Sequence, residues 1–315
     1  MNGELLVWGI FSLLILGMLF LDLVVFHREE HEVSLREALI WTGIWIVLGL
    51  LFSLFIYTQK GLDATLAYLA GYLVEKSLSL DNIFVFQVIF TYFAVPAKYR
   101  HKILFWGVVG ALVMRGVFIV AGVTLIKMFH WVVYLLGLLL VYTGIRMVTE
   151  HGKVIEPERN PVIRLARRLV PMTSHYEGGR FFVRKDGRLY ATPLLAVLLV
   201  VESTDVVFAV DSIPAIMALT TDPVIIYTSN VFALLGLRAL YFALSGLLQL
   251  FHYLNYGLSV ILVFVGVKML ISGFYKIPTW VALLVVVVTL TASIVASLWW
   301  PKATESSHQP VGQDG

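Results

Sequence analysis

The chain has 315 residues, of which 59% are hydrophobic and 14% are charged, and its formal net charge is +3. A soluble domain is typically about 45–50% apolar and 25% charged, so this composition excludes an ordinary soluble protein and predicts a polytopic membrane protein. The sequence contains no cysteine, which excludes disulfides, thiolate metal sites and cysteine nucleophiles. The first 26 residues are apolar but lack the basic region and cleavage site of a signal peptide. We therefore expect them to form a retained first span.

Apolar runs of spanning length predict an all-α fold of about nine transmembrane helices. The runs lie at residues 5–26, 39–57, 66–93, 103–128, 131–147, 191–219, 224–250, 256–274 and 280–300. They fall into two transmembrane halves, residues 1–147 with helices 1–5 and residues 191–300 with helices 6–9. A basic loop, residues 148–190, joins the halves, and we expect the polar tail, residues 301–315, to be disordered.

Lysine and arginine are distributed unevenly between the predicted loops. With nine spans, the loops on one side together with the C-terminus carry sixteen basic residues, whereas the other side carries three, Lys60, Lys127 and Lys276. Because basic loops tend to stay in the cytoplasm, we expect the N-terminus outside and the C-terminus in the cytoplasm. The basic loop would then be cytoplasmic, with an amphipathic helix near residues 161–170 and a hairpin at residues 181–190.

Helices 3–5 and helices 6–8 are predicted to be inverted copies of one another. The matching parts are Glu75 with Asp205, Asp81 with Asp211, Arg115 with Arg238, and residues 129–147 with residues 251–269. The offset between matching residues is 130 for the acids, 123 for the arginines and 122 for the last pair. Because three spans separate equivalent helices, the two copies have opposite orientations in the membrane. Inverted repeats with a polar site at mid-depth are typical of secondary transporters.

Carboxylates inside the apolar runs are the strongest functional signal in the sequence. An aspartate at the centre of a membrane helix costs roughly 2.5–3.5 kcal/mol, which favours a cavity that holds a positive charge. The candidate metal ligands are Asp22, Glu75, Asp81, Asn82, Glu202, Asp205 and Asp211. Such hard oxygen donors suit Mg²⁺, Ca²⁺ or Mn²⁺, whereas the eight histidines lie in loops or at helix ends, so Zn²⁺, Cu²⁺ and Ni²⁺ are poor candidates.

Basic residues within the spans are interpreted as counter-charges to these acids. They are Lys76, Arg115 and Arg238, and Lys268 is a fourth cation within a span. Six carboxylates and four cations, all ionised, leave a charge of −2, which one divalent cation would neutralise. The alternative is a structural network in which the acids only neutralise the bases.

Helical geometry limits which of the acids meet. At 100° per residue, Glu75 and Asn82 lie about 20° apart on one face, whereas Asp211 lies almost opposite Glu202. Pro214 cannot donate a backbone hydrogen bond to the carbonyl group of Val210. The sequence therefore predicts an unwound or kinked segment near residues 209–214, whose free carbonyl groups would help to bind the ion.

Enzymatic functions are disfavoured by missing motifs. The sequence has no phosphate loop of the pattern Gly-x-x-x-x-Gly-Lys-Ser/Thr, which an ATPase would need. It has no histidine within a span to pair with the serine of an intramembrane serine protease, and it lacks the Gly-x-Gly-Asp pattern of intramembrane aspartyl proteases. We therefore do not expect an enzyme.

Two segments resemble the signatures of a known membrane-protein family. Residues 71–86 (GYLVEKSLSLDNIFVF) and residues 200–215 (VVESTDVVFAVDSIPA) are similar to those of the TerC family, and residues 228–239 continue the second. The resemblance covers roughly residues 5–300 and is greatest to the Alx-type branch, which is associated with manganese export from the bacterial cytoplasm. It implies that the family's acidic residues correspond to Glu75, Asp81, Glu202, Asp205 and Asp211, with Asp22 in helix 1.

Composition and spacing predict a membrane protein that handles a hard divalent cation, and the resemblance implies that the ion is Mn²⁺. We therefore expect a secondary-active Mn²⁺ exporter of the bacterial inner membrane that works by alternating access, with protons as the simplest coupling ion. Mn²⁺ would be the transported ion and no cofactor would be permanently bound. The expected surroundings are the lipid bilayer, without nucleic acid, and the oligomeric state is left open. The rival hypothesis is a membrane partner protein that assists insertion or metal loading of other proteins. A tellurite or stress-resistance factor is a third hypothesis.

Deletion of residues 160–171, the amphipathic part of the basic loop, discriminates between the first two hypotheses. A transporter should keep its metal flux after this deletion because the predicted metal site lies in the spans. A docking protein should lose its function. Metal flux across vesicles, measured before and after the deletion, checks this expectation, and lost flux in a folded variant would contradict the transporter hypothesis.

Overall fold

The structure, a computed structural model, describes residues 9, 11, 13, 15, 17, 34–149, 171–173, 175–185, 187–244 and 253–299. Within these residues, seven helices are long and apolar enough to cross a membrane, which confirms a helical, polytopic membrane protein. Of the predicted first span, only alternate residues between 9 and 17 are described, and these are helical. The predicted amphipathic helix and the C-terminal tail lie outside the described residues. The count of nine spans and the inverted repeat stay predictions.

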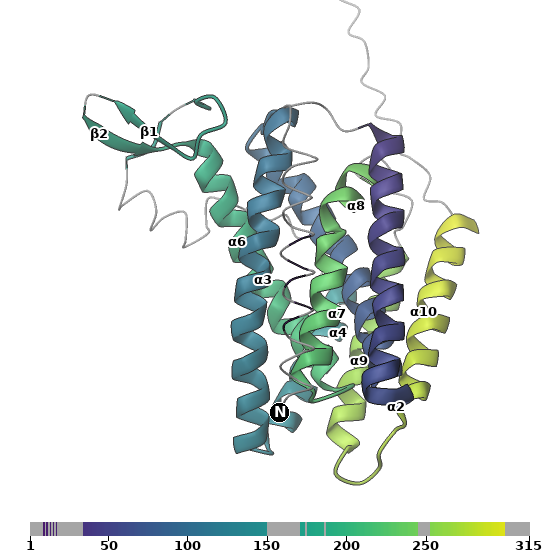
Figure 1. Cartoon of the computed structure of the whole chain (residues 1–315). Coiled ribbons are helices and arrows are strands. Elements are labelled where there is room, and N and C mark those ends of the chain that lie inside the picture. The colour runs from purple at the N-terminus through teal and green to yellow at the C-terminus, as the bar shows by residue number, and fades with distance from the viewer. Residues whose placement is uncertain are drawn as a thin grey trace, which may run out of the picture.

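The helices pack side by side into one bundle, and a small hairpin extends from one end of it (Figure 1). The helices are α2 (Leu35–Tyr92), α3 (Ala97–Met128), α4 (Val132–Thr149), α6 (Pro193–Met217), α7 (Pro223–Leu235), α8 (Leu237–Leu244), α9 (Leu254–Ile271) and α10 (Thr279–Trp299). The strands are β1 (Phe182–Lys185) and β2 (Arg188–Ala191), which pair antiparallel. This hairpin lies where the sequence predicts one.

α2 is a pair of helical arms that reverse direction at a glycine. Its 58 residues would span about 87 Å if straight, at about 1.5 Å per residue, which is nearly three times the hydrocarbon core of a bilayer. Gly61 has φ 81° and ψ −173°, a conformation that glycine adopts without strain. The two arms cover the predicted spans 39–57 and 66–93. Next to the turn, Lys60 forms an ion pair with Asp222, whose carboxylate also caps the first turn of α7 at the amide of Val224.

α6 is helical throughout, so the unwound form of the predicted segment near residues 209–214 is wrong, and the kinked form stays a prediction. Pro214 lies inside the helix, where its missing donor removes one hydrogen bond of the ladder. Packing compensates for that loss, because Ala209, Ile213 and Ile216 belong to a buried apolar cluster with Ile119 and other residues of α3. A tightly packed wall therefore keeps the proline segment helical.

At two glycines, α4 and α9 approach each other so closely that no larger side chain would fit. A Cβ atom at Gly144 would lie 2.9 Å from the carbonyl oxygen of Ser259, and one at Gly266 would lie 2.7 Å from that of Gly137. The repeat offset of 122 relates Gly144 to Gly266 and Gly137 to Ser259. If each residue of the first contact is replaced by its repeat equivalent, the second contact results. The two helices therefore contact each other reciprocally.

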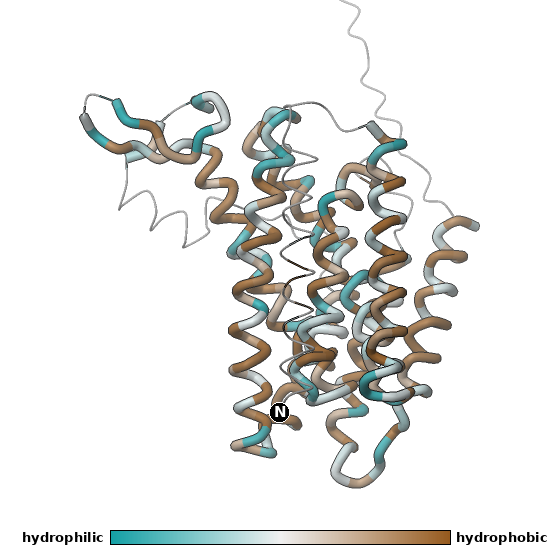
Figure 2. Tube along the Cα trace, viewed as in Figure 1, coloured by the Kyte–Doolittle hydropathy of each residue, from teal (hydrophilic) through white to brown (hydrophobic). Residues whose placement is uncertain are grey.

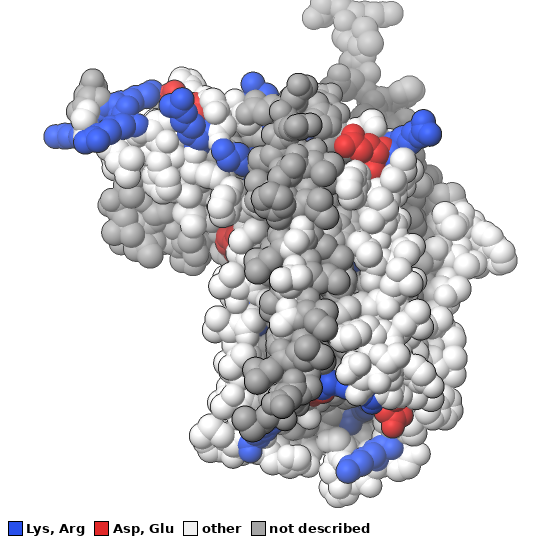
Figure 3. Space-filling view, viewed as in Figure 1, with Lys and Arg blue, Asp and Glu red and all other residues white. Residues whose placement is uncertain are grey.

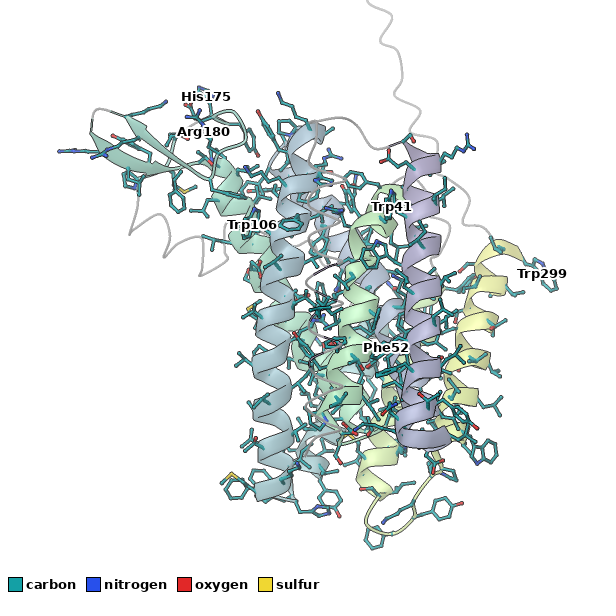
Figure 4. All side chains as sticks on the ribbon, in the orientation of Figure 1. Trp41, Phe52, Trp106, His175, Arg180 and Trp299 are labelled. Atoms are coloured by element: carbon teal, nitrogen blue, oxygen red, sulfur yellow. The ribbon has the colours of Figure 1, made fainter. Side chains whose placement is uncertain are left out.

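The outside of the bundle is apolar, as contact with lipid requires. Val113, Val117 and Val120 form a stripe along α3 and are each 65–66% exposed. Figure 2 shows apolar residues along the length of the outer helices, and Figure 3 shows lysine, arginine and acidic side chains gathered mainly near the two ends. Inside, Phe52 of α2 points into the bundle, whereas Trp299 lies exposed at the end of α10 (Figure 4). The bundle surface therefore suits a bilayer.

The segment just before the hairpin is attached to the bundle by hydrogen bonds to the end of α2 and the start of α3. The hydroxyl group of Tyr176 donates to the carbonyl oxygen of Phe93 at 2.8 Å, and Lys102 donates to that of Gly179 at 2.7 Å. Glu177 and Lys185 are linked at 2.5 Å, and this hydrogen bond lowers the pKa of the Glu177 carboxyl group. These contacts hold the hairpin beside the start of α6.

The substitution Gly266→Ala should destabilise the bundle. The added methyl group meets backbone atoms of α4, which cannot turn away as a side chain would, so we expect a loss of about 1–3 kcal/mol. The matched control is Gly43→Ala, where an added Cβ has no neighbour within 4 Å and alanine favours the helix. Thermal unfolding of the purified protein in detergent checks both variants. Equal stability of the two would contradict close α4–α9 packing.

Candidate cation site

A polar cavity of about 410 Å³ lies within the bundle. α2, α3, α4, α6 and α9 supply its walls. Its polar and charged lining consists of Glu75, Asp81, Asn82, Arg115, Thr143, Arg146, Asp211, Ser212 and Asn255. The structure thus brings together four of the seven predicted metal ligands, namely Glu75, Asp81, Asn82 and Asp211, around one space.

Arg115 is the centre of a buried network beside this cavity. Its guanidinium group forms an ion pair with Glu75 and donates a hydrogen bond from Nη2 to Asp205 Oδ1 at 3.2 Å. Nη1 also donates to Asn230 Oδ1 at 2.6 Å and to Ser212 Oγ at 3.2 Å. One side chain of α3 therefore links α2, α6 and α7.

The charges of this network do not cancel. Glu75 is 0% exposed, Arg115 1% and Asp205 3%, so all three lie away from solvent. If all are ionised, two carboxylates face one guanidinium group and a charge of −1 remains. Uncompensated buried charge is unfavourable by several kcal/mol per ion, so in that ionisation state the region would attract a further positive charge.

Two oxygen atoms of the cavity wall lack a donor. Within the described part of the chain, Glu75 Oε2 and Asn82 Oδ1 are buried and accept no hydrogen bond. The two residues are seven positions apart on α2, so they lie on one face of the helix, as the sequence predicts. A buried acceptor without a partner costs about 1–3 kcal/mol. A cation bound in the cavity would satisfy both oxygens.

The other side of the cavity is formed by α4 and α6. Asp211 accepts a hydrogen bond from Thr143 Oγ1 at 2.9 Å, and Arg146 interacts with it electrostatically. Thr143 and Arg146 are three residues apart, which places them on neighbouring positions of one helix face. Asp81 lines the same space from α2. The cavity therefore has carboxylates on two opposing helices.

Sequence reasoning missed Thr143, Arg146 and Asn255. Arg146 lies at the end of its apolar run, beside the basic loop, and no role is assigned to it from the sequence. Its repeat equivalent, Lys268, lies within a predicted span, and this is the signal that could have identified it. Thr143 and Asn255 carry no such signal, because single hydroxyl and amide groups are common in membrane helices.

The remaining predicted ligands lie elsewhere. Asp205 is behind the cavity wall, held by Arg115. Glu202 lies on the other side of α6 against Gly110 of α3, where any Cβ atom would overlap its carboxylate. This placement agrees with the predicted angle between Glu202 and Asp211. Asp22 lies outside the described residues. Among the residues that are described, no three histidine or acidic side chains converge on one metal position in this conformation.

The three predicted counter-charges occupy different surroundings. Arg115 forms the ion pairs with Glu75 and Asp205. Lys76 donates to the carbonyl oxygen of Ala233 at 3.2 Å, in the last turn of α7, where carbonyl groups lack helical partners. Its ammonium group thus stabilises the break between α7 and α8. Arg238 is buried in α8 and is 4% exposed.

Replacing Arg115 with glutamine should strongly destabilise the protein. Two buried carboxylates would lose their cation, and breaking a buried ion pair in this way costs about 3–5 kcal/mol. The control is Arg36→Gln at the exposed start of α2, which should change stability by less than about 0.5 kcal/mol. Thermal unfolding in detergent checks both. Similar small losses would mean that the acids are neutral and need no counter-charge.

Comparison with known proteins places this architecture in one family. The family model described as "Integral membrane protein TerC family" matches residues 60–305. An uncharacterized membrane protein of Myxococcus xanthus is 48% identical over 303 residues, covering 96% of this chain and 93% of the relative. Two proteins named "Putative membrane-bound redox modulator Alx" are similar over 306 residues. The one from Salmonella typhi is 46% identical and the one from Escherichia coli (strain K12) is 44% identical, and each alignment covers 94% of this chain and 95% of the relative.

No solved structure is significantly similar to the chain. The matches in sequence cover nearly its whole length, and they include the segments that carry Glu75, Asp81, Asp205 and Asp211. The chain belongs to the TerC family of integral membrane proteins.

Proposed function

We propose that the chain is a secondary-active exporter of a hard divalent cation, Mn²⁺, rather than an enzyme. The observation that carries this proposal is the pair of buried oxygens without donors, Glu75 Oε2 and Asn82 Oδ1, which belong to residues that line a cavity together with Asp81 and Asp211. Carboxylate and amide oxygens are the ligands that hard divalent cations prefer. The choice of Mn²⁺ over Ca²⁺ or Mg²⁺ rests on the family resemblance. Mn²⁺ is the transported ion and not a resident cofactor.

The charge of the site supports a divalent cation. In and beside the cavity, four carboxylates face two guanidinium groups, which leaves −2 if all are ionised. The acids are Glu75, Asp81, Asp205 and Asp211, and the bases are Arg115 and Arg146. One divalent cation would neutralise this surplus. The balance counted from sequence was also −2, but with a different set of residues.

Alternating access accounts for the separation of the acids in this conformation. Arg115 holds Glu75, and Thr143 holds Asp211, so the carboxylates need a rearrangement of the helices to bind one ion together. The reciprocal glycine contacts between α4 and α9 support an inverted repeat, which gives transporters two related conformations. A cation would favour the conformation in which the carboxylates converge, because it binds that conformation more tightly.

Export requires an energy source other than ATP. Moving a divalent cation out of a negative interior costs about 4.6 kcal/mol per 100 mV, from about 2.3 kcal/mol per charge. Protons that bind the same carboxylates on their way inward are the simplest coupling ion. In this proposal the protein lies in the bacterial inner membrane with its N-terminus outside and its C-terminus in the cytoplasm.

Flux of radioactive Mn²⁺ in proteoliposomes tests the proposal. Asp81→Asn and Asp211→Asn should each abolish saturable flux, because each removes one negative charge from the cavity without a change of size. The matched control is Asp63→Asn, the same substitution at an exposed position beside the Gly61 turn, which should keep the flux of the unaltered protein. Flux that survives both cavity substitutions would place the cation site elsewhere.

The same vesicles test proton coupling. With the membrane potential clamped, the rate of Mn²⁺ flux should change with an imposed pH gradient. A flux that is independent of the pH gradient would contradict proton coupling but would not contradict cation transport.

The second candidate is a membrane partner protein that assists insertion or metal loading of other proteins. The observation that favours it is the β1–β2 hairpin, which extends beyond the bundle and exposes Arg184, Lys185 and Arg188 (Figures 1 and 3). The names of the relatives refer to redox modulation, but this chain has no cysteine, so thiol–disulfide exchange is not open to it. Absence of flux from a folded, metal-binding sample would favour this candidate.

A further inference from the structure

A second cavity, of about 770 Å³, lies at the end of the bundle opposite the hairpin. The ends of α3, α6 and α9 and the loop before α10 surround it. Its ionisable lining is basic, consisting of Lys127, His130, Lys268 and Lys276, and the lining contains no aspartate or glutamate. Thr221, Ser272 and Thr279 add hydroxyl groups. In its charge, this cavity is therefore the reverse of the first one.

Lys268 is the unusual member of this group. It is 8% exposed and lies in the last turn of α9. Over the part of the chain that the structure describes, its ammonium group has neither an ion pair nor a hydrogen bond to protein. Lys268 Nζ is not among the buried atoms without a partner, so the ammonium group is the accessible part of a mostly buried side chain that lines the cavity. An unpaired ammonium group that lines a cavity therefore indicates an anionic occupant of that cavity.

The repeat sharpens this contrast. Lys268 and Met269 correspond to Arg146 and Met147 at the offset of 122, and the first pair lines the second cavity as the other pair lines the first. In the first cavity, Arg146 interacts electrostatically with Asp211. In the second cavity, the equivalent lysine faces no acid of the lining. A ligand from outside the chain would take the place of that carboxylate.

We propose that the second cavity binds a phosphate-type oxyanion. Three ammonium groups, an imidazole and hydroxyl donors suit a compact anion with several oxygens. Thr279, the first residue of α10, adds the positive end of a 21-residue helix, whose first amide groups lack helical partners. The anion is either free phosphate or the phosphate group of a lipid, which share this chemistry.

Lysines that only balance the negative ends of helices would need no ligand. Lys127 and Lys268 lie in the last turns of α3 and α9, where a cation is favourable. Lys276 lies in the loop between α9 and α10, so that explanation does not cover it. Lys276 is therefore the residue whose substitution separates the two explanations.

The test uses the full chain, purified in a neutral detergent and separately in nanodiscs of phosphatidylcholine with or without phosphatidylglycerol. Binding of inorganic phosphate is measured by calorimetry in detergent, and the stabilisation by phosphatidylglycerol is measured as a shift in unfolding temperature in nanodiscs. Lys268→Met and Lys276→Gln should each weaken phosphate binding at least tenfold, or abolish the shift in unfolding temperature that phosphatidylglycerol causes. The control is Lys98→Gln, at an exposed position at the opposite end of the bundle. This substitution should change phosphate binding by less than twofold and keep the shift in unfolding temperature.

The outcomes separate the sources of the anion. Phosphate binding in detergent that both lysine variants lose identifies a free oxyanion. A phosphatidylglycerol shift that both variants lose, without phosphate binding, identifies a lipid headgroup. Equal behaviour of the variants and the unaltered protein, or no effect of either anion, overturns the proposal. Thermal unfolding of each variant without added anion serves as the check of folding, and because the two cavities are separate, failure here leaves the proposed transport function unaffected.

Discussion

The structure depends on one guanidinium group that is buried in the middle of a membrane bundle. Arg115 cannot lose its charge in a protein, so the helices around it must provide acids. Glu75 of α2 and Asp205 of α6 do so, and Asn230 of α7 accepts a further hydrogen bond. This requirement fixes the relative positions of four helices. It also explains why two acids can lie in apolar segments at a cost the chain tolerates.

If its three members are ionised, the same network has a residual negative charge, and in the proposed function this charge attracts the cation. Arg115 pairs with one oxygen of Glu75, and the other oxygen is buried without a donor. A cation in the cavity would therefore share Glu75 with Arg115 instead of replacing it. The helix α4 completes the arrangement, because Thr143 and Arg146 orient Asp211 from the far side. The proposed cation site and the packing of the bundle thus rely on the same side chains.

α4 and α9 contact each other closely, and residues near their ends line the two cavities. Glycines at the contact bring the backbones together and leave the ends of the helix pair to flank separate spaces. Arg146 near the end of α4 and Lys268 near the end of α9 each line one of them. The cavities differ in charge because the acids of α2 and α6 face only the first. Two related helices therefore contribute to two sites of opposite character.

The sequence by itself determined what depends on local periodicity and composition. The length of the apolar runs predicted a helical membrane protein, and the helical angle placed Glu75 and Asn82 on one face and Glu202 away from Asp211, as the structure has them. The motifs also indicated the family. Tertiary structure alone decided which acids Arg115 holds, that Lys76 stabilises a helix break, and that Thr143, Arg146 and Asn255 join the cavity. It also overruled the unwinding expected at Pro214, because packing against α3 keeps α6 helical. The reason is physical: a helix fixes the directions of its own side chains, whereas contacts between helices depend on how distant segments pack.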